Sequence, residues 1–114
     1  MKRGEIWQVN LDPTIGAEIQ KSRPAIIVNR DALAKLPLRI IVPLTTWDER
    51  YSAAPWHIPI QASEENGLSK KSSADTFQVR SVSDKRLVKK LGEITPEEMA
   101  QVEKGLSISL ALED

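Results

Sequence analysis

Short runs rich in β-branched and aromatic residues recur along this chain of 114 residues. Each run is bounded by Pro, Gly, Asp or Ser, which commonly end strands and form turns. The pattern predicts five short strands, at residues 5–10, 24–30, 39–44, 56–61 and 76–82. Pro59 places the fourth strand at a sheet edge or in a bulge, because proline cannot donate to a central ladder. We therefore expect a compact, strongly bent antiparallel β-barrel or sandwich.

The C-terminal region instead has the period of a helix. Thr95-Pro96-Glu97-Glu98 has the form of a capping box with proline at the first helical position. Met99, Val102 and Leu106 follow at helical spacing, which predicts a helix over residues 95–112 with one apolar stripe facing the core. The segment 106–112 has more apolar residues than one stripe needs, and a dimer contact could use the excess. A single helical turn is expected at residues 31–36, and a polar loop at residues 47–55.

The composition indicates a folded chain forming a single domain over residues 1–114. Hydrophobic residues make up 40% of it and charged residues 28%, with no long biased tract. With no cysteine and a single histidine, the chain offers neither a disulfide nor the usual ligands of a zinc site. We therefore expect no metal and no cofactor. No apolar run approaches the ~20 residues of a membrane span and no signal-peptide core is present, so a cytoplasmic protein is expected.

The net charge of zero argues against a protein that binds nucleic acid over its whole surface. Positive charge nevertheless gathers in the second half of the chain, at Lys70-Lys71, Arg80 and four cations between residues 85 and 90. Such a patch could hold a phosphate backbone by counterion release, or the last run could be a solvated face. Binding to nucleic acid would then be local and sensitive to salt.

The polar segment between the first two strands carries the most informative chemistry. Pro13 and Gly16 indicate a turn, and Pro24 forces Arg23 into an extended conformation at the mouth of a strand. Together with Glu18, this guanidinium makes the loop a candidate for phosphate chemistry, because the arginine fork matches two phosphate oxygens. The alternative is a solvated hairpin loop whose charges only maintain solubility.

Further candidates lie in the second half. Gln78 and Arg80 are two residues apart, which puts them on one face of the predicted strand. Glutamine can read base edges and arginine can pair with phosphate. Trp47 and Trp56 flank the polar loop, and either could stack on an unpaired base. His57 follows at the start of a strand, where it could contact RNA or serve a structural role.

The order of these motifs resembles the MazF/PemK/Kid family of toxins. The matching segments are Arg3-Gly4-Glu5-Ile6-Trp7, Asp12-Pro13-Thr14-Ile15-Gly16-Ala17-Glu18, Ser22-Arg23-Pro24-Ala25-Ile26-Ile27-Val28, Val42-Pro43-Leu44-Thr45-Thr46, Gln78-Val79-Arg80-Ser81-Val82 and Leu91-Gly92-Glu93-Ile94. They cover nearly the whole chain, in order and without large insertions.

The resemblance implies an SH3-like antiparallel β-barrel with a C-terminal helix, and a homodimeric, metal-independent endoribonuclease toxin. It implies cleavage of single-stranded RNA to 2′,3′-cyclic phosphate or 3′-phosphate and 5′-hydroxyl ends, with a cognate antitoxin as partner. It also implies that Arg23 and Thr45 are catalytic, with Thr46 as the alternative if the register slips by one residue. The expected RNA contacts are Glu18, Gln20, Lys21, Thr46, Trp47, His57, Gln78 and Arg80.

The chain departs from the family in two segments. Residues 19–22 replace a Gln and paired glycines found in many members, which predicts a stiffer loop and a different cut site. Residues 73–77 are more polar than the usual apolar run. Two other functions therefore stay open: a toxin of the same fold that inhibits DNA gyrase, and an RNA-binding barrel without activity. A gyrase inhibitor would need neither Arg23 nor Thr45.

Overall fold

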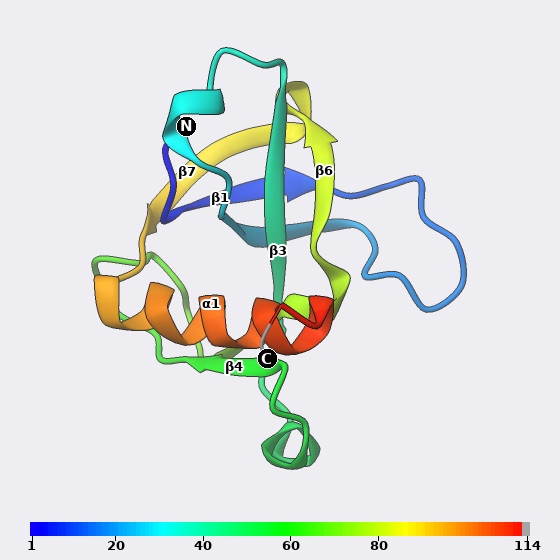
Figure 1. Cartoon of the computed structure of the whole chain (residues 1–114), viewed down its shortest axis with the longest axis vertical. Coiled ribbons are helices and arrows are strands. Elements are labelled where there is room, and N and C mark those ends of the chain that lie inside the picture. Colours follow the sequence, from blue (N-terminus) through cyan, green and yellow to red (C-terminus); the bar gives the residue numbers. More distant parts are fainter. Residues whose placement is uncertain (113–114) are drawn as a thin grey trace.

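The computed structural model describes residues 1–112, so the terminal acids Glu113 and Asp114 lie outside the described residues. Seven antiparallel strands form one bent sheet in the order β4-β5-β3-β2-β1-β7, with β6 paired to β3 off this path (Figure 1). The strands are β1 (Glu5–Asn10), β2 (Ser22–Ile27), β3 (Leu38–Thr46), β4 (His57–Ile60), β5 (Ser72–Asp75), β6 (Arg80–Ser83) and β7 (Leu87–Glu93). Within residues 1–112 no pairing joins β4 to β7, so the barrel-like sheet is open.

One α-helix and four short 3-10 helices complete the chain. The α-helix is α1 (Pro96–Leu110), and the 3-10 helices are η1 (Asp31–Leu33), η2 (Glu49–Ala53), η3 (Thr76–Gln78) and η4 (Asp84–Arg86). Helix α1 lies against β4 and η3. The β1–β2 connection projects from the body of the molecule at the right of Figure 1. Within residues 1–112, no helix has both the length and the apolar composition needed to cross a membrane.

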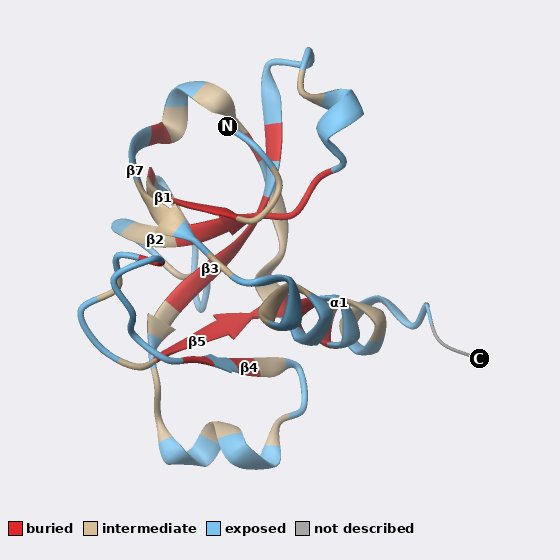
Figure 2. Ribbon diagram, turned by 90° about the vertical axis from the view of Figure 1, so that its left-hand side faces the viewer, coloured by how far each residue is buried: buried red, intermediate tan, exposed pale blue. Residues whose placement is uncertain are grey.

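The bent sheet has a hydrophobic cluster on each face. One cluster includes Ile26, Leu44 and Val102 and is covered by α1. The other includes Val9, Ile27 and Ile41. Strands β1, β2, β3 and β5 supply most of the buried residues, as the red segments of Figure 2 show. Alternating residues of the same strands thus serve both clusters, which accounts for their dense apolar runs.

The predicted mainly β architecture with a C-terminal helix is confirmed. Strand β1 has the predicted bounds, and β4, which contains Pro59, is at the end of the sheet as expected. The capping box at Thr95 is formed in both directions, and Val102 is fully buried with Met99 and Leu106 packed beside it. The single turn after residue 30 is a 3-10 turn, and the polar loop contains η2.

One strand prediction was wrong, and two strands, β5 and β7, were not predicted. The segment 76–82 is not one strand, because η3 occupies its first half and only Arg80–Ser83 is extended. Strand β5, just before it, was missed because its sequence Ser-Ser-Ala-Asp is polar although all four residues are buried. Strand β7 was read as a solvated face. It has an exposed side and pairs with β1 through two register shifts, which break any simple alternation.

The loop between β4 and β5 is fixed by backbone contacts over residues 61–71. Asn66 is only 1% exposed, and its side chain accepts from the Ser63 and Leu68 amides (3.0 Å each) and donates to the Gln61 carbonyl (2.7 Å). Gly92 of β7 lies directly against the Asn66 backbone, where a Cβ would come within 2.5 Å of a carbonyl carbon. The loop therefore has one well-defined position against the sheet.

Glu5 is a nearly buried carboxylate at the start of β1, with 7% of its surface exposed. Desolvation by burial alone would raise its pKa. Hydrogen bonds from Trp7 Nε1 (2.9 Å) and the Lys2 amide (3.0 Å) outweigh burial, together with Lys90 Nζ at 3.3 Å and the Met1 amino group at 3.4 Å. They lower the pKa of Glu5 from 4.5 to about 2. The ionised side chain therefore stabilises the fold.

This lowered pKa predicts a pH-dependent effect of Glu5→Gln. A depressed folded-state pKa gives stability that is present above pH 4.5 and lost as the pH falls toward about 2. We expect the variant to be less stable than the wild type by on the order of 2 kcal/mol at pH 7, and the difference to shrink toward zero near pH 2. Urea unfolding across this range measures it. Glu93→Gln, which removes an exposed partner of the same Lys90, is the control and should show a small effect. A pH-independent difference for Glu5→Gln would contradict the assignment.

Candidate functional site

A polar pocket of about 340 Å³ opens where β2 and β3 separate. The two strands pair from Ile27 and Ile41 as far as Ala25 and Pro43, and there their pairing ends. The same register continued by two residues sets Arg23 opposite Thr45, and both residues line the pocket. Its third wall is the loop at residues 67–70. We call this cavity the Arg23 pocket.

Arg23 is held at the wall of this pocket with its charged end free. It pairs with Val9 in the β1–β2 ladder and is half-buried. Its Nε donates to the Gln20 carbonyl at 3.3 Å, which fixes the start of the guanidinium. Among the described residues, neither Nη atom has a hydrogen-bond or ion-pair partner. The fork is therefore available for an anion in the pocket.

Thr45 and Thr46 both line the Arg23 pocket, so the structure places both alternatives of the sequence analysis beside Arg23. Thr45 is half-buried and pairs with Ser73 of β5, whereas Thr46 is exposed and pairs with Ser72. Directly opposite residues of an antiparallel pair share a face of the sheet. Thr45 therefore shares the face of Ser73.

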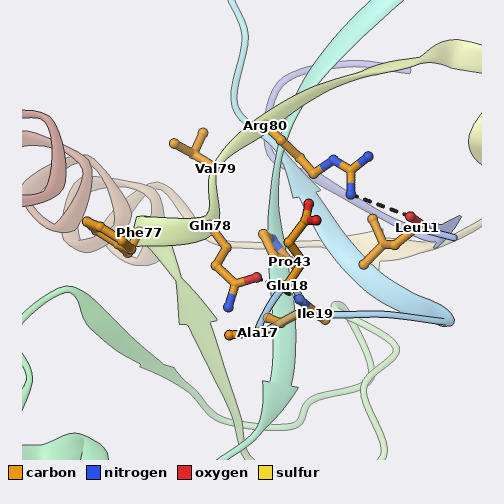
Figure 3. A pocket seen from close by; sticks show the side chains of 9 residues that line it. All are labelled: Leu11, Ala17, Glu18, Ile19, Pro43, Phe77, Gln78, Val79 and Arg80. Atoms are coloured by element: carbon orange, nitrogen blue, oxygen red, sulfur yellow. Dashed lines mark hydrogen bonds between the residues drawn. The ribbon is translucent and has the colours of Figure 1, made fainter. Parts of the chain in front are cut away.

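A second cavity, of about 430 Å³, adjoins the first along β3 and is lined by Glu18, Pro43, Gln78 and Arg80 among others (Figure 3). We call it the Gln78 pocket. Pro43 lines this cavity, and the residues that follow it in β3 line the Arg23 pocket. Six of the predicted site residues are therefore divided between two adjoining hollows, whereas Gln20, Lys21, Trp47 and His57 line neither of them. Gln78 and Arg80 do lie together, although through η3 and the start of β6 rather than along one strand.

Gln78 ties the β1–β2 loop to the body of the protein. Its Oε1 accepts from the Ile19 amide at 2.7 Å, and its Nε2 donates to Asp75 Oδ2 at 3.1 Å. Arg80 Nη1 reaches the Leu11 carbonyl at 3.4 Å, at the other end of the same loop (Figure 3). Glu18 Oε1 accepts from the Ile15 amide at 2.7 Å within the loop. These contacts fix the loop over the Gln78 pocket.

Lys21 of this loop has a backbone conformation that is unusual for a residue other than glycine. This exposed residue has φ 69°, in the left-handed region that glycine adopts freely. Its amide donates to Asp12 Oδ1 at 3.0 Å and its carbonyl accepts from the Leu11 amide at 2.9 Å. A lysine in this conformation restricts the loop more than a glycine would, in agreement with the expected stiffness.

The polar segment 73–77 is explained by internal hydrogen bonds. Ser73 is fully buried, with its hydroxyl 2.7 Å from His57 Nδ1. Asp75 accepts from Gln78 and from the Phe77 amide. The Thr76 hydroxyl donates to the Trp56 carbonyl at 2.7 Å and lies 2.9 Å from Ser109 Oγ on α1. The polar side chains thus organise the region around the two pockets.

Aromatic residues of the η2 loop form a cluster beside the site. The Tyr51 ring stacks on His57 with centroids 3.9 Å apart and planes 2° from parallel. Trp47 packs edge-on against Tyr51 at 5.7 Å, and Lys71 Nζ lies 4.7 Å from the Trp47 ring centre. Trp56 is close to His57 but also lines an apolar hollow with Phe77 and the end of α1. His57 is therefore fixed by stacking and by Ser73.

Several lining residues were not identified from the sequence. Gln8, Ser69, Lys70 and Ser72 complete the Arg23 pocket. The Lys70-Lys71 pair was visible as local positive charge, but its place beside Arg23 depends on the loop conformation. Within residues 1–112, no group of three or more His, Cys, Asp or Glu side chains is placed to hold a metal ion.

The fold and the pocket together define a small bent-sheet protein with an arginine-lined cavity at the divergence of two strands. Residues 2–110 match the family described as PemK-like, MazF-like toxin of type II toxin-antitoxin system. Endoribonuclease MazF9 of Mycobacterium tuberculosis is 33% identical over 118 residues, with 98% of each chain covered. Endoribonuclease EndoA of Bacillus subtilis is 30% identical over 114 residues, covering 100% of this chain and 97% of that protein. The chain belongs to the PemK-like, MazF-like toxin family.

Solved structures agree in fold. MazF from Deinococcus radiodurans superposes with a TM-score of 0.81 at 23% identity, covering 97% of this chain and 96% of that one. An endoribonuclease in complex with its cognate antitoxin from a mycobacterial species gives a TM-score of 0.78 at 21% identity, covering 100% and 98%. The described architecture is therefore the MazF fold, and the family expected from the motifs is confirmed by the match over residues 2–110.

Proposed function

We propose that this protein is an endoribonuclease toxin that cuts single-stranded RNA in a sequence-specific manner without a metal ion. The observation that carries the proposal is the Arg23 pocket, in which a guanidinium with free Nη atoms and the Thr45 hydroxyl line one cavity. Within residues 1–112 no carboxylate lines this pocket, so no described side chain there competes with a phosphate for the cation. The two relatives named endoribonucleases support the same activity.

The proposed reaction is an internal transfer. The ribose 2′-hydroxyl loses its proton to solvent as its oxygen attacks the adjacent phosphorus, the bond from phosphorus to the 5′-oxygen breaks, and the leaving oxygen takes a proton. The products are a 2′,3′-cyclic phosphate, or its 3′-phosphate hydrolysis product, and a 5′-hydroxyl. Arg23 stabilises the charge that develops on the non-bridging oxygens, and its second role is proton donation to the leaving oxygen.

Thr45 is the proposed second catalytic residue, because its hydroxyl can donate to a phosphate oxygen or orient the 2′-hydroxyl. We expect Thr45→Val to lower kcat for RNA cleavage roughly 10- to 100-fold, as for loss of one hydrogen bond to a charged group. The β-branched shape is kept, so the strand should be unaffected.

The matched control is Thr46→Val, which makes the same change at the exposed neighbouring position. We expect its kcat to fall less than about threefold. A larger loss for Thr46→Val than for Thr45→Val, measured under single-turnover conditions, would exchange the two assignments.

The RNA strand is proposed to pass over both adjoining pockets. Glu18, Gln78 and Arg80 would contact nucleotides in the Gln78 pocket, while Thr46 would contact RNA beside Arg23. Gln20 and Lys21 border the strand path through the β1–β2 loop. Trp47 and His57 would contact bases at the η2 loop, where the aromatic cluster already orients them.

The proposed partners are a cognate antitoxin and a second copy of the chain. A structurally similar endoribonuclease is found in complex with its cognate antitoxin. An acidic segment of an antitoxin would complement the uncompensated charge of the Arg23 pocket.

An apolar hollow of about 410 Å³, lined by Trp56, Phe77 and Ile108, with Phe77 69% exposed, supports a homodimer contact at the end of α1. The proposed location is the cytoplasm, where RNA is available.

A purified sample tests the proposal against its rivals. Incubation with long single-stranded RNA in excess EDTA should give discrete cuts, and a supercoiling assay with DNA gyrase should show no inhibition. Gyrase inhibition without RNA cleavage would support the non-enzymatic toxin. RNA binding with neither activity would support the inactive barrel.

A further inference from the structure

The Arg23 pocket contains a second cation, Lys70, on the wall opposite the strands. Arg23 comes from β2 and Lys70 from the loop before β5, so the two charges reach the cavity from different elements. Ser69 of the same loop and Ser72 at the start of β5 also line the pocket. The pocket thus combines two positive charges with hydroxyl groups, and none of the described residues that line it is an acid.

Lys70 differs from Lys71 and Lys90 in having no side-chain partner among the described residues. Lys90 Nζ lies 3.3 Å from Glu5 Oε2 and 3.1 Å from Glu93 Oε1. Lys71 Nζ lies over the Trp47 ring at 4.7 Å. In the part of the chain that the structure describes, Lys70 Nζ has neither a hydrogen bond nor an ion pair. Two uncompensated cations lining one cavity favour binding of a polyanion there.

The position of Lys70 is fixed although its side chain is exposed. Asn66 and Gly92 hold the loop from one side, as described above. From the other side, the Lys71 carbonyl accepts from the Trp47 amide at 3.1 Å, and the Lys70 carbonyl accepts from Ser72 Oγ at 3.1 Å. The backbone at Lys70 is therefore ordered before any ligand binds, which lowers the cost of binding.

We infer that Lys70 binds the RNA phosphate next to the one that is cut, so that the Arg23 pocket is a two-phosphate subsite. The inference rests on the proposed function. Arg23 has the planar fork suited to the phosphate that changes geometry, whereas a lysine ammonium is a flexible point charge suited to a neighbouring phosphate that does not react. Lys70 is accordingly a binding residue, and its loss should weaken RNA binding and leave kcat at saturating RNA nearly unchanged.

Lys70→Gln and Lys71→Gln form a matched pair, because they remove the same charge from adjacent residues of which only Lys70 lines the pocket. Binding is measured with a short, fully 2′-O-methylated RNA, which cannot be cut, at several salt concentrations. For Lys70→Gln we expect Kd to rise about fivefold near 0.1 M salt, and the slope of log K against log salt to fall by about 0.7. Lys71→Gln should keep the wild-type slope.

A second measurement identifies the phosphate. Each phosphate of the RNA is replaced in turn by a neutral methylphosphonate, and one replacement adjacent to the cut site should weaken the wild type but not Lys70→Gln further. The inference would be overturned by equal salt slopes for Lys70→Gln and Lys71→Gln. It would also be overturned if every methylphosphonate replacement weakened RNA binding by Lys70→Gln as much as binding by the wild type. Because this RNA is uncleavable, that result is separate from the proposed function, which fails if wild-type protein cuts no RNA.

Discussion

Replacing Arg23 by alanine is expected to lower the rate of RNA cleavage about 100- to 1,000-fold, the usual effect of removing one preorganised donor to a developing oxyanion. The loss should appear mainly in kcat, because the guanidinium is proposed to bind the transition state more strongly than the ground state. Arg23 is half-buried, and among the described residues its side chain has one hydrogen bond, to the Gln20 carbonyl, so the melting temperature should change little. Single-turnover cleavage and thermal unfolding of the same sample measure both effects.

Arg30→Ala is the matched control, because Arg30 is an exposed arginine between β2 and η1 that does not line the Arg23 pocket. We expect it to cut RNA at nearly the wild-type rate. Equal activity of Arg23→Ala and wild type would place the chemistry outside the Arg23 pocket. An equal loss in both variants would reduce the role of Arg23 to general positive charge.

Among the proposed variants, replacing Gly92 by alanine is expected to cause the largest loss of stability. The added Cβ would lie 2.2 Å from the Glu65 carbonyl oxygen and 2.5 Å from the Asn66 carbonyl carbon, and both atoms belong to backbone. Relieving this overlap requires the loop at residues 61–71 to move, at a cost of about 3 kcal/mol in the free energy of unfolding. RNA cleavage should fall as well, because the same loop forms one wall of the Arg23 pocket.

Gly16→Ala provides the comparison, because a Cβ at this loop position meets no atom within 4 Å. Its φ of 60° still disfavours alanine, so a loss of about 1–2 kcal/mol is expected without a change in the Arg23 pocket. Urea unfolding measures both variants. If Gly92→Ala were no less stable than Gly16→Ala, the close packing of the loop on β7 would be wrong.

The sequence predicted the elements whose local pattern agrees with their final environment. Strand β1 is a short apolar run with polar residues at both ends, and α1 has its cap, its proline and its apolar stripe in order. The polar sequence of β5 does not match its buried environment. Ser73 and Asp75 are buried because they form hydrogen bonds with His57 and Gln78, and no local sequence pattern specifies these partners. In β7, bulges against β1 removed the alternation that would have identified it.

The candidate site was likewise predictable only where a local sequence motif specifies the residue. Arg23 was found from the proline that follows it at the mouth of a strand and Thr45 from the family resemblance, and the structure brings them together at the ends of two central strands. Lys70 was expected only as part of a basic patch, because its place beside Arg23 results from contacts of Asn66 and Gly92, which are far apart in sequence. Gln78 was expected to read a base, and its amide in this structure is engaged by Ile19 and Asp75. Contact with RNA through that amide would require one of these hydrogen bonds to be exchanged.

The central claim is metal-independent cleavage of RNA through its own 2′-hydroxyl. The most direct measurement compares two short RNAs in excess EDTA, identical except for a single 2′-deoxyribose at the nucleotide before a mapped cut. We predict that the all-ribose RNA is cut, leaving a 2′,3′-cyclic phosphate or 3′-phosphate and a 5′-hydroxyl, and that the deoxy-substituted RNA stays intact at that bond. Cutting of both RNAs at the same rate, or products with a 3′-hydroxyl and a 5′-phosphate, would contradict the proposed function.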